Sequence, residues 1–159
     1  SSSKCDWGEE LSRGAEAEVE VRPTERVRVR GNWTHLFTRV TDTRTTGTAF
    51  VRGEPLLRRP RNAGSATVSL TPTDEWELTF TLISVGDRTD RDFKQASAGV
   101  RVENPDYRTV DAAVSWKFRP GWRAFAAGRN LTDATYEEAY GFPADRSNFL
   151  AGVEVAFRY

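Results

Sequence analysis

The sequence predicts an all-β fold: an antiparallel, up-and-down sheet of about seven strands that forms part of a transmembrane β-barrel. Three observations lead to this fold class. Apolar and polar side chains alternate with a period of two, as in strands that have one apolar face. Short and long connections alternate between these strands. Aromatic residues gather at the strand ends.

The composition is compatible with this fold and excludes some functions. The chain has 159 residues, of which 29% are charged, and no stretch approaches the roughly 18 apolar residues of a transmembrane helix. Barrel strands distribute their apolar residues in alternation, so a membrane location is still compatible with these numbers. The formal net charge is zero, which removes the electrostatic basis for binding nucleic acid.

The first predicted hairpin joins Gly14–Val21 to Val27–Val40 through the turn-forming residues Arg22–Arg26. A symmetric turn places apolar residues against each other on one face and opposite charges on the other, as cross-strand neighbours prefer. The expected pairs are Val21 with Val27, Glu20 with Arg28, Val19 with Val29 and Glu18 with Arg30.

Two further hairpins repeat this design, with turns at Thr71–Glu75 and Arg119–Gly121. The first of them is expected to pair Leu70 with Trp76, Val68 with Leu78, Ala66 with Phe80 and Gly64 with Leu82. The other is expected to pair Phe118 with Trp122, Trp116 with Ala124, Val114 with Ala126 and Asp111 with Arg129. The last strand, Phe149–Tyr159, alternates in the same way and ends on an aromatic residue.

The connections favour a membrane barrel over a soluble β-sandwich, whose inner faces are also apolar. The short turns alternate with three long connections, Thr41–Arg59, Gly86–Asp106 and Leu131–Asn148. Outer-membrane barrels combine tight periplasmic turns with long extracellular loops in this way. The paired charges on the polar faces also suit a hydrated lumen.

Aromatic residues stand where two membrane interfaces are expected. The rim of the short turns carries Trp76, Trp116, Phe118, Trp122, Phe157 and Tyr159. The rim of the long loops carries Trp33, Phe37, Tyr107 and Phe149. The single histidine, His35, is expected at this second interface and is not expected to bind a metal.

The end of the chain carries a recognisable combination of motifs. Asn130-Leu131-Thr132-Asp133 is followed by Tyr136 and then by the aromatic-terminated strand. Matching stretches upstream are Ser12–Glu16, Leu57–Arg61 and Val110–Trp116. In this order and at these distances from the C-terminus, they resemble the C-terminal part of a TonB-dependent outer-membrane receptor.

The resemblance implies a 22-stranded barrel in the outer membrane of a Gram-negative bacterium, closed around an N-terminal plug. Residues 1–159 would supply about seven of its last strands, without the plug and the earlier strands. The implied function is active uptake of a scarce, bulky nutrient, either a ferric siderophore or a cobalamin-like ligand, with energy from the TonB complex through the plug. The implied partner in assembly is the barrel-assembly machinery, with a signal at Gly152, Val155, Phe157 and Tyr159.

No arrangement of residues indicates an enzyme. The chain has one histidine and one cysteine, Cys5, and it has no metal-ligand spacing, phosphate loop or nucleophile elbow. We therefore expect no catalytic residue, no metal site and no cofactor. Two other functions stay open from the residues alone: another outer-membrane barrel, such as a passive pore or a structural protein, and a soluble all-β binding module.

If the chain belongs to an uptake receptor, the long loops should meet the ligand first, because loops on a rigid scaffold carry recognition. Cationic and aromatic side chains there are suited to an anionic or aromatic ligand. The candidates are Arg44, Arg52, Arg58, Arg88, Arg91, Tyr136, Tyr140 and Phe142.

Overall fold

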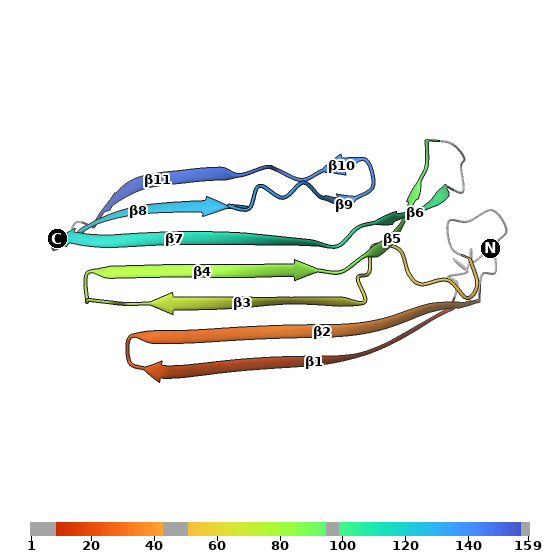
Figure 1. Cartoon of the computed structure of the whole chain (residues 1–159), viewed down its shortest axis with the longest axis horizontal. Helices are drawn as coiled ribbons and strands as arrows, with labels where there is room; N and C mark the ends of the chain where they lie inside the picture. Colours follow the sequence, from red (N-terminus) through yellow and green to blue (C-terminus); the bar gives the residue numbers. More distant parts are fainter. Residues whose placement is uncertain (1–8, 43–50, 95–98, 157–159) are drawn as a thin grey trace, which may run out of the picture.

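A computed structural model describes residues 9–42, 51–94 and 99–156, and these residues form an all-β structure (Figure 1). The main sheet has seven antiparallel strands in the order β1-β2-β3-β4-β7-β8-β11, so the prediction of about seven strands is confirmed. Its strands are β1 (Glu9–Thr24), β2 (Val27–Asp42), β3 (Asn62–Leu70), β4 (Trp76–Val85), β7 (Tyr107–Arg119), β8 (Trp122–Arg129) and β11 (Asn148–Val155). No helix among the described residues is long and apolar enough to cross a membrane.

Two small hairpins, which the sequence did not reveal, lie in the long connections. The first consists of β5 (Arg88–Asp92) and β6 (Val100–Asn104), and the second of β9 (Glu137–Ala139) and β10 (Phe142–Pro143). Both lie at the end of the sheet opposite the short turns (Figure 1). The short turns therefore share one rim and the long connections share the other, as predicted.

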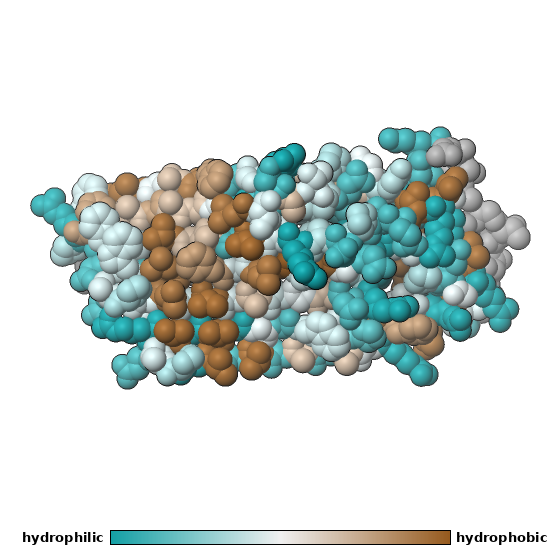
Figure 2. Space-filling model, viewed as in Figure 1, coloured by the Kyte–Doolittle hydropathy of each residue, from teal (hydrophilic) through white to brown (hydrophobic). Residues whose placement is uncertain are grey.

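The main sheet has one apolar face, which follows from the period of two. The register places Leu78, Phe80 and Leu82 of β4 on the same face as Val114 and Ala112 of β7. Large apolar side chains on this face are well exposed, among them Phe80 at 44% and Leu82 at 45%. Hydrophobic side chains gather over the sheet in Figure 2, and hydrophilic side chains gather over the loop end. A large apolar face of this kind is unfavourable in water and is typical of a surface that contacts lipid or another apolar partner.

The predicted register of the first hairpin is wrong by two residues. Val21 lies opposite Val29, and Glu20 lies opposite Arg30 instead of Arg28. The turn is tighter than expected, since Thr24 already pairs with Val27, and an irregularity follows between Val21 and Thr24. Pro23 lies in this irregularity and has no N–H to donate to a ladder. A shift by two residues preserves the faces, so Glu20 still pairs with an arginine, at 2.7 Å from Nε of Arg30.

The second hairpin differs from the prediction by two residues as well. Leu70 lies opposite Leu78 and Val68 opposite Phe80. The turn is wider than expected, because the residues on its two sides bond to neighbouring hairpins and not to each other. The N–H of Thr71 donates to the carbonyl of Arg26. On the other side, Trp76 pairs with Trp116 of β7.

The third hairpin follows the prediction over most of its length. Trp116 lies opposite Ala124 and Val114 opposite Ala126. At the turn, Arg119 and not Phe118 pairs with Trp122. Gly121 has a φ of 77°, a left-handed conformation that glycine adopts without strain and that permits this two-residue turn.

Candidate functional site at the loop end

Strand β5 of the hairpin β5–β6 lies buried among the long loops, whereas most residues of β6 are exposed. The residues of β5, Arg-Thr-Asp-Arg-Asp, are each at most 8% exposed although all of them are polar. Burying charged groups is costly unless they are paired and hydrogen-bonded. The contacts of this strand therefore decide whether the loops form an ordered unit.

Asp90 is 0% exposed and joins three long connections. Its Oδ1 accepts a hydrogen bond from Nε of Arg58 at 3.0 Å, and its Oδ2 accepts one from the N–H of Tyr140 at 2.8 Å. The N–H of Arg91 donates to Oδ1 at 2.8 Å. Burial raises the pKa of Asp90, but the two backbone donors and Arg58 together hold it below its ordinary value. Asp90 is thus a buried carboxylate that ties the first and third long connections to the second.

The two arginines of β5 also bind neighbouring loops. Nη2 of Arg91 lies 2.8 Å from Oε2 of Glu54 in the first long connection. Nη2 of Arg88 donates to the carbonyl of Glu137 in the third at 2.6 Å. The guanidinium of Arg88 also lies over the ring of Tyr107, with 5.1 Å between Cζ and the ring centroid. These contacts engage both guanidinium groups inside the loop cluster, and the buried Nε of each has no hydrogen-bond partner among the described residues.

Asn130 fixes the base of the third long connection. Its φ of 49° is left-handed, which asparagine tolerates better than most residues. Its Nδ2 donates to the carbonyls of Ala134 at 2.9 Å and Asp145 at 3.3 Å, and its Oδ1 accepts from the N–H of Ala134 at 3.0 Å. Its own N–H donates to Oδ1 of Asp111 on β7 at 2.9 Å. The loop is therefore anchored to the sheet.

Asp133 holds the returning part of the same loop. Nε of Arg146 lies 2.6 Å from its Oδ1, and the N–H of Ser147 donates to that oxygen at 3.3 Å. The hydrogen bond from Arg146 is the main reason why the pKa of Asp133 lies well below its ordinary value. The Asn-Leu-Thr-Asp segment thus has a definite structural role, which is to close the base of this loop.

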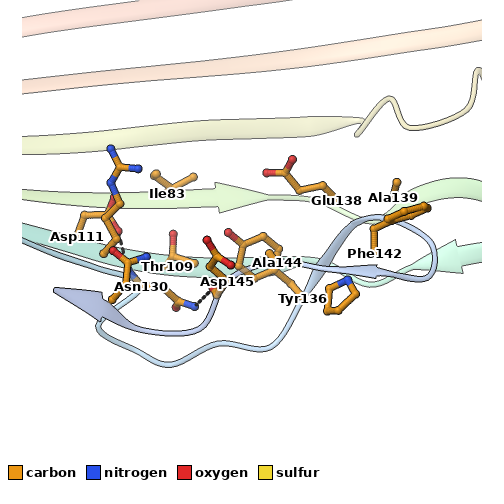
Figure 3. Close-up of a pocket in the computed structure, with 13 residues that line it drawn as sticks. Ile83, Thr109, Asp111, Asn130, Tyr136, Glu138, Ala139, Phe142, Ala144 and Asp145 are labelled. Atoms are coloured by element: carbon orange, nitrogen blue, oxygen red, sulfur yellow. Dashed lines mark hydrogen bonds between the residues drawn. The ribbon is translucent and has the colours of Figure 1, made fainter. Parts of the chain in front are cut away.

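A hollow of about 770 Å³ lies between this loop and the polar face of the sheet. Figure 3 shows Tyr136, Phe142 and Asp145 of the loop around the same space as Thr109 and Asp111 of β7. Its lining consists of Ile83, Thr109, Asp111, Arg129, Asn130, Tyr136, Glu138, Ala139, Phe142, Pro143, Ala144, Asp145 and Asn148. Three carboxylates and one guanidinium in this set make the hollow rich in hydrogen-bond acceptors, beside two aromatic rings.

The aromatic residues in and beside the hollow divide into a stacked pair and exposed members. The rings of Tyr107 and Tyr136 stack with 3.8 Å between centroids and 15° between planes. Phe142 is 72% exposed and Tyr140 is 39% exposed. Burial, first of all, and the carboxylate of Glu138 raise the pKa of the Tyr136 phenol.

The predicted ligand-contacting residues are placed in different environments. Tyr136 and Phe142 line the hollow, and Tyr140 adjoins it through Asp90. Arg58 is half exposed and bound to Asp90, whereas Arg88 and Arg91 are buried. Arg52 is exposed, and Arg44 lies outside the described residues. Sequence reasoning missed Asp90, because β5 has no apolar residue and hence no periodicity to detect.

Most of the predicted interface aromatics that the structure describes are exposed, but the prediction is wrong for Tyr107, which lies on the polar face and stacks on Tyr136 in the loop cluster. Exposed large side chains include Trp33, Phe37, Trp76, Trp116, Phe118, Trp122 and Phe149. Near the short turns, Trp76 and Trp116 stack with 5.3 Å between centroids, and Phe118 lies between Trp116 and Trp122. Phe157 and Tyr159 lie outside the described residues. Gly152 lies opposite Phe125, whose ring would be 2.7 Å from a Cβ there, so glycine at this position leaves room for the ring.

Among the described residues, no group of His, Cys, Asp and Glu side chains is arranged to hold a metal ion. Cys5 lies outside the described residues.

Solved structures of siderophore receptors have the same fold as this chain. The siderophore receptor PiuA from Acinetobacter baumannii superposes with a TM-score of 0.77 at 15% identity, covering 93% of this chain and 22% of the receptor. The ferric-catecholate import receptor Fiu from Escherichia coli K12 gives 0.76 at 17% identity, with 95% and 22% covered. FpvA of Pseudomonas aeruginosa, in complex with a ferric pyoverdine, gives 0.75 at 17%, with 92% and 19% covered. The chain thus spans about a fifth of the length of these receptors.

The sequence comparison agrees with the fold. No curated protein sequence matches the chain significantly. The family model for the β-barrel of TonB-dependent receptor-like proteins matches residues 8–131, which include the first six strands of the main sheet. This family is one of transport receptors, not enzymes. The chain therefore belongs to the TonB-dependent receptor family, as part of its β-barrel.

Proposed function

We propose that the chain forms the C-terminal wall of a receptor barrel in the outer membrane of a Gram-negative bacterium. The receptor takes up a scarce, bulky metal chelate or cobalamin-like ligand with energy from the TonB complex. The observation that carries the proposal is the pairing of two regions: a sheet with an exposed apolar face, and an ordered loop cluster that encloses an aromatic-lined hollow on the polar face. The solved neighbours are described as siderophore receptors, which makes a ferric siderophore the first ligand to test.

The rest of the barrel and the plug would come from residues that precede this chain in the receptor. The sheet supports this, because β1 and β11 each have one neighbour among the described strands. Open strand edges do not occur in the hydrocarbon region of a membrane, so further strands must pair with them. The plug would supply the contact with the TonB complex.

In this proposal the loop residues have two roles. Tyr136, Tyr140 and Phe142 contact the ligand, since they line or adjoin the hollow and Phe142 is largely exposed. Arg58, Arg88 and Arg91 hold the loops in place through the contacts described above. Arg44 and Arg52 are further candidates for the outer surface of the site.

The direct test is transport of ferric siderophore by a strain whose chromosomal copy of the receptor gene is deleted. The full receptor should restore uptake of radiolabelled iron, and this uptake should stop when the TonB gene is deleted or the proton gradient is dissipated. Uptake that is independent of both would identify a passive pore. Restoration of cobalamin uptake in place of iron uptake would identify a cobalamin-like ligand and would still support TonB-dependent uptake.

Assembly provides a separate test at the C-terminus. We propose that Gly152, Val155, Phe157 and Tyr159 contribute to the signal that the barrel-assembly machinery reads. Deleting Tyr159 or replacing Phe157 by serine should lower the amount of receptor at the cell surface, measured by surface labelling. Normal surface levels of both variants would show that these aromatics serve only as interface residues.

A further inference from the structure

The hollow between the third long connection and the polar face of the sheet has a negatively charged lining. Its charged groups are the carboxylates of Asp111, Glu138 and Asp145 and the guanidinium of Arg129, which give a formal net charge of −2. Glu138 and Asp145 are exposed, and within the part of the chain that the structure describes their carboxylates form no hydrogen bond or ion pair. Both side chains therefore keep their full capacity to accept hydrogen bonds from a ligand.

A buried hydroxyl group lines the same hollow. Thr109 lies on β7 opposite Ile83, on the polar face, and is only 4% exposed. Figure 3 shows it at the hollow, two residues before Asp111 on the same strand. Its Oγ1 has no hydrogen-bond partner among the described residues. Because a buried polar group without a partner is unfavourable, this hydroxyl points to a polar ligand group in the hollow.

The aromatic rings of the lining add to the preference for positive charge. Tyr136 and Phe142 both line the hollow, and Phe142 is 72% exposed. The face of an aromatic ring attracts a cation through its quadrupole. Burial, first of all, and then the three carboxylates of the lining raise the pKa of the Tyr136 phenol, so the negative potential of all three reaches this ring.

The arginines of the loop cluster are engaged away from the hollow. Nε of Arg58 and Nη2 of Arg91 lie 3.0 Å and 2.8 Å from carboxylate oxygens, and Nη2 of Arg88 donates to a backbone carbonyl at 2.6 Å. None of the three lines the hollow, where Arg129 is the only cation of the described lining. An anionic ligand, which these arginines led us to expect from the sequence, would meet more carboxylates than guanidinium groups there.

We propose that the hollow binds a positively charged group of the ligand, such as a primary ammonium, with Glu138, Asp145 and Thr109 as acceptors. An ammonium group has three N–H donors, which match two carboxylates and one hydroxyl in number. The receptor would then select cationic metal chelates over polyanionic ones. This inference rests on the uptake function proposed above and adds the charge of the ligand to it.

The test uses the purified full receptor and three ferric complexes of one linear trihydroxamate, desferrioxamine B, which differ only at the terminal amine. The free amine gives a cationic complex, the acetylated amine a neutral one and the succinylated amine an anionic one. Equilibrium binding of radiolabelled iron should show that the cationic complex binds at least about tenfold more tightly than the anionic one, with the neutral complex between them. Equal affinities, tighter binding of the anion, or no binding of any of the three would overturn the proposal.

Two variants of the hollow connect this order of affinities to its carboxylates. Glu138→Gln combined with Asp145→Asn keeps the size of both side chains and should remove most of the difference between the cationic and anionic complexes. Glu138→Lys combined with Asp145→Lys should reverse the order, so that the anionic complex binds more tightly. Heat-modifiable migration in gels reports whether each variant is folded. A preference for the cation that persists in both folded variants would overturn the proposal.

A matched control removes two exposed carboxylates of the same loop end that do not line the hollow. Asp87→Asn combined with Asp106→Asn should leave the order of affinities unchanged. An equal loss of the preference in this control and in the hollow variant would overturn the proposal. Iron uptake is measured separately: TonB-dependent uptake without a charge preference contradicts only this inference, whereas a charge preference without uptake contradicts only the proposed function.

Discussion

The main sheet and the loop cluster of this chain follow opposite rules of burial. In the sheet, large apolar side chains such as Phe80 and Leu82 are exposed, and no apolar core is needed. In the loop cluster, the charged strand Arg88–Asp92 is buried. The two regions therefore bury opposite kinds of side chain, and the proposed membrane location explains this, because the apolar face would meet lipid and the loops would meet water.

The two regions are also stabilised differently. The backbone hydrogen bonds between strands stabilise the sheet, and the exposed side chains of its apolar face contribute little to this stability in water. In the loops, side chains join short hairpins to one another: the single carboxylate of Asp90 receives hydrogen bonds from Arg58, Arg91 and Tyr140. Loss of one outward side chain should therefore disturb the sheet little, whereas loss of Asp90 should loosen several loops together.

The largest expected effect comes from placing a charge on the lipid face of the sheet. Ala112→Arg, near the middle of β7 and opposite Phe80, should lower the free energy of unfolding of the full receptor by about 2–4 kcal/mol. Thr67→Arg lies on the polar face, where Oγ1 of Thr67 is 3.1 Å from that of Thr81, and should cost about 1 kcal/mol for that hydrogen bond. Denaturant titration in lipid vesicles measures both. Equal costs would contradict the assignment of the two faces.

The second effect concerns the loop cluster. Asp90→Ala removes the acceptor for three donors, including the N–H of Tyr140, and should destabilise the loops by about 1–3 kcal/mol. Hydrogen exchange of the Tyr140 amide should become about tenfold faster or more, while exchange in β7 and β8 stays unchanged. Asp87→Ala, an exposed carboxylate close by in the same connection, is the control. Unchanged exchange at Tyr140 would show that Asp90 does not hold the loops together.

The same carboxylate gives the loops a dependence on pH. Because the folded structure lowers the pKa of Asp90 below its ordinary value of 3.8, the ionised form stabilises the cluster. This contribution is complete above about pH 5 and is lost as the pH falls through the folded pKa. Exchange of the Tyr140 amide, corrected for its intrinsic pH dependence, should stay constant from pH 7 to pH 5 and accelerate below. In Asp90→Asn that acceleration should be absent.

A smaller effect is expected at the base of the third loop. Asn130→Ala removes the hydrogen bonds to Ala134 and Asp145, which should cost about 1–2 kcal/mol locally and expose the loop to protease. Asp133→Asn keeps a side-chain oxygen that can accept from the N–H of Ser147 and weakens the exposed pair with Arg146, so its effect on proteolysis should be smaller. Limited digestion of intact cells compares the two. A larger effect of Asp133→Asn would show that Asp133, and not Asn130, is the main anchor of this loop.

The sequence predicts the sheet well because period-two alternation reports directly which residues share the apolar face. The number of strands, the two rims and the faces follow from it. The registers of the first two hairpins do not, because alternation is blind to a shift by two residues. The register of the first hairpin depends on the irregularity at Pro23, and that of the second depends on the hydrogen bond from the N–H of Thr71 to Arg26.

The loop cluster could not be predicted in this way. Tyr136 and Phe142 were identified as candidate ligand contacts because aromatic residues are conspicuous in a loop, and both line the hollow. Asp90 was missed because a buried carboxylate is recognised by its donors, and these come from residues 58, 91 and 140. Such long-range pairing leaves no periodic signal in the sequence.

The most direct test of the two-solvent account is the accessibility of adjacent positions on one strand. In a Cys5→Ser background of the full receptor, single cysteines at 110–115 of β7 are spin-labelled in lipid vesicles. Collision rates with oxygen and with a water-soluble nickel chelate are then measured. Oxygen accessibility should peak at Val110, Ala112 and Val114, and nickel accessibility should peak at Asp111, Ala113 and Ser115. A profile without this alternation, or with the two phases exchanged, would contradict the account.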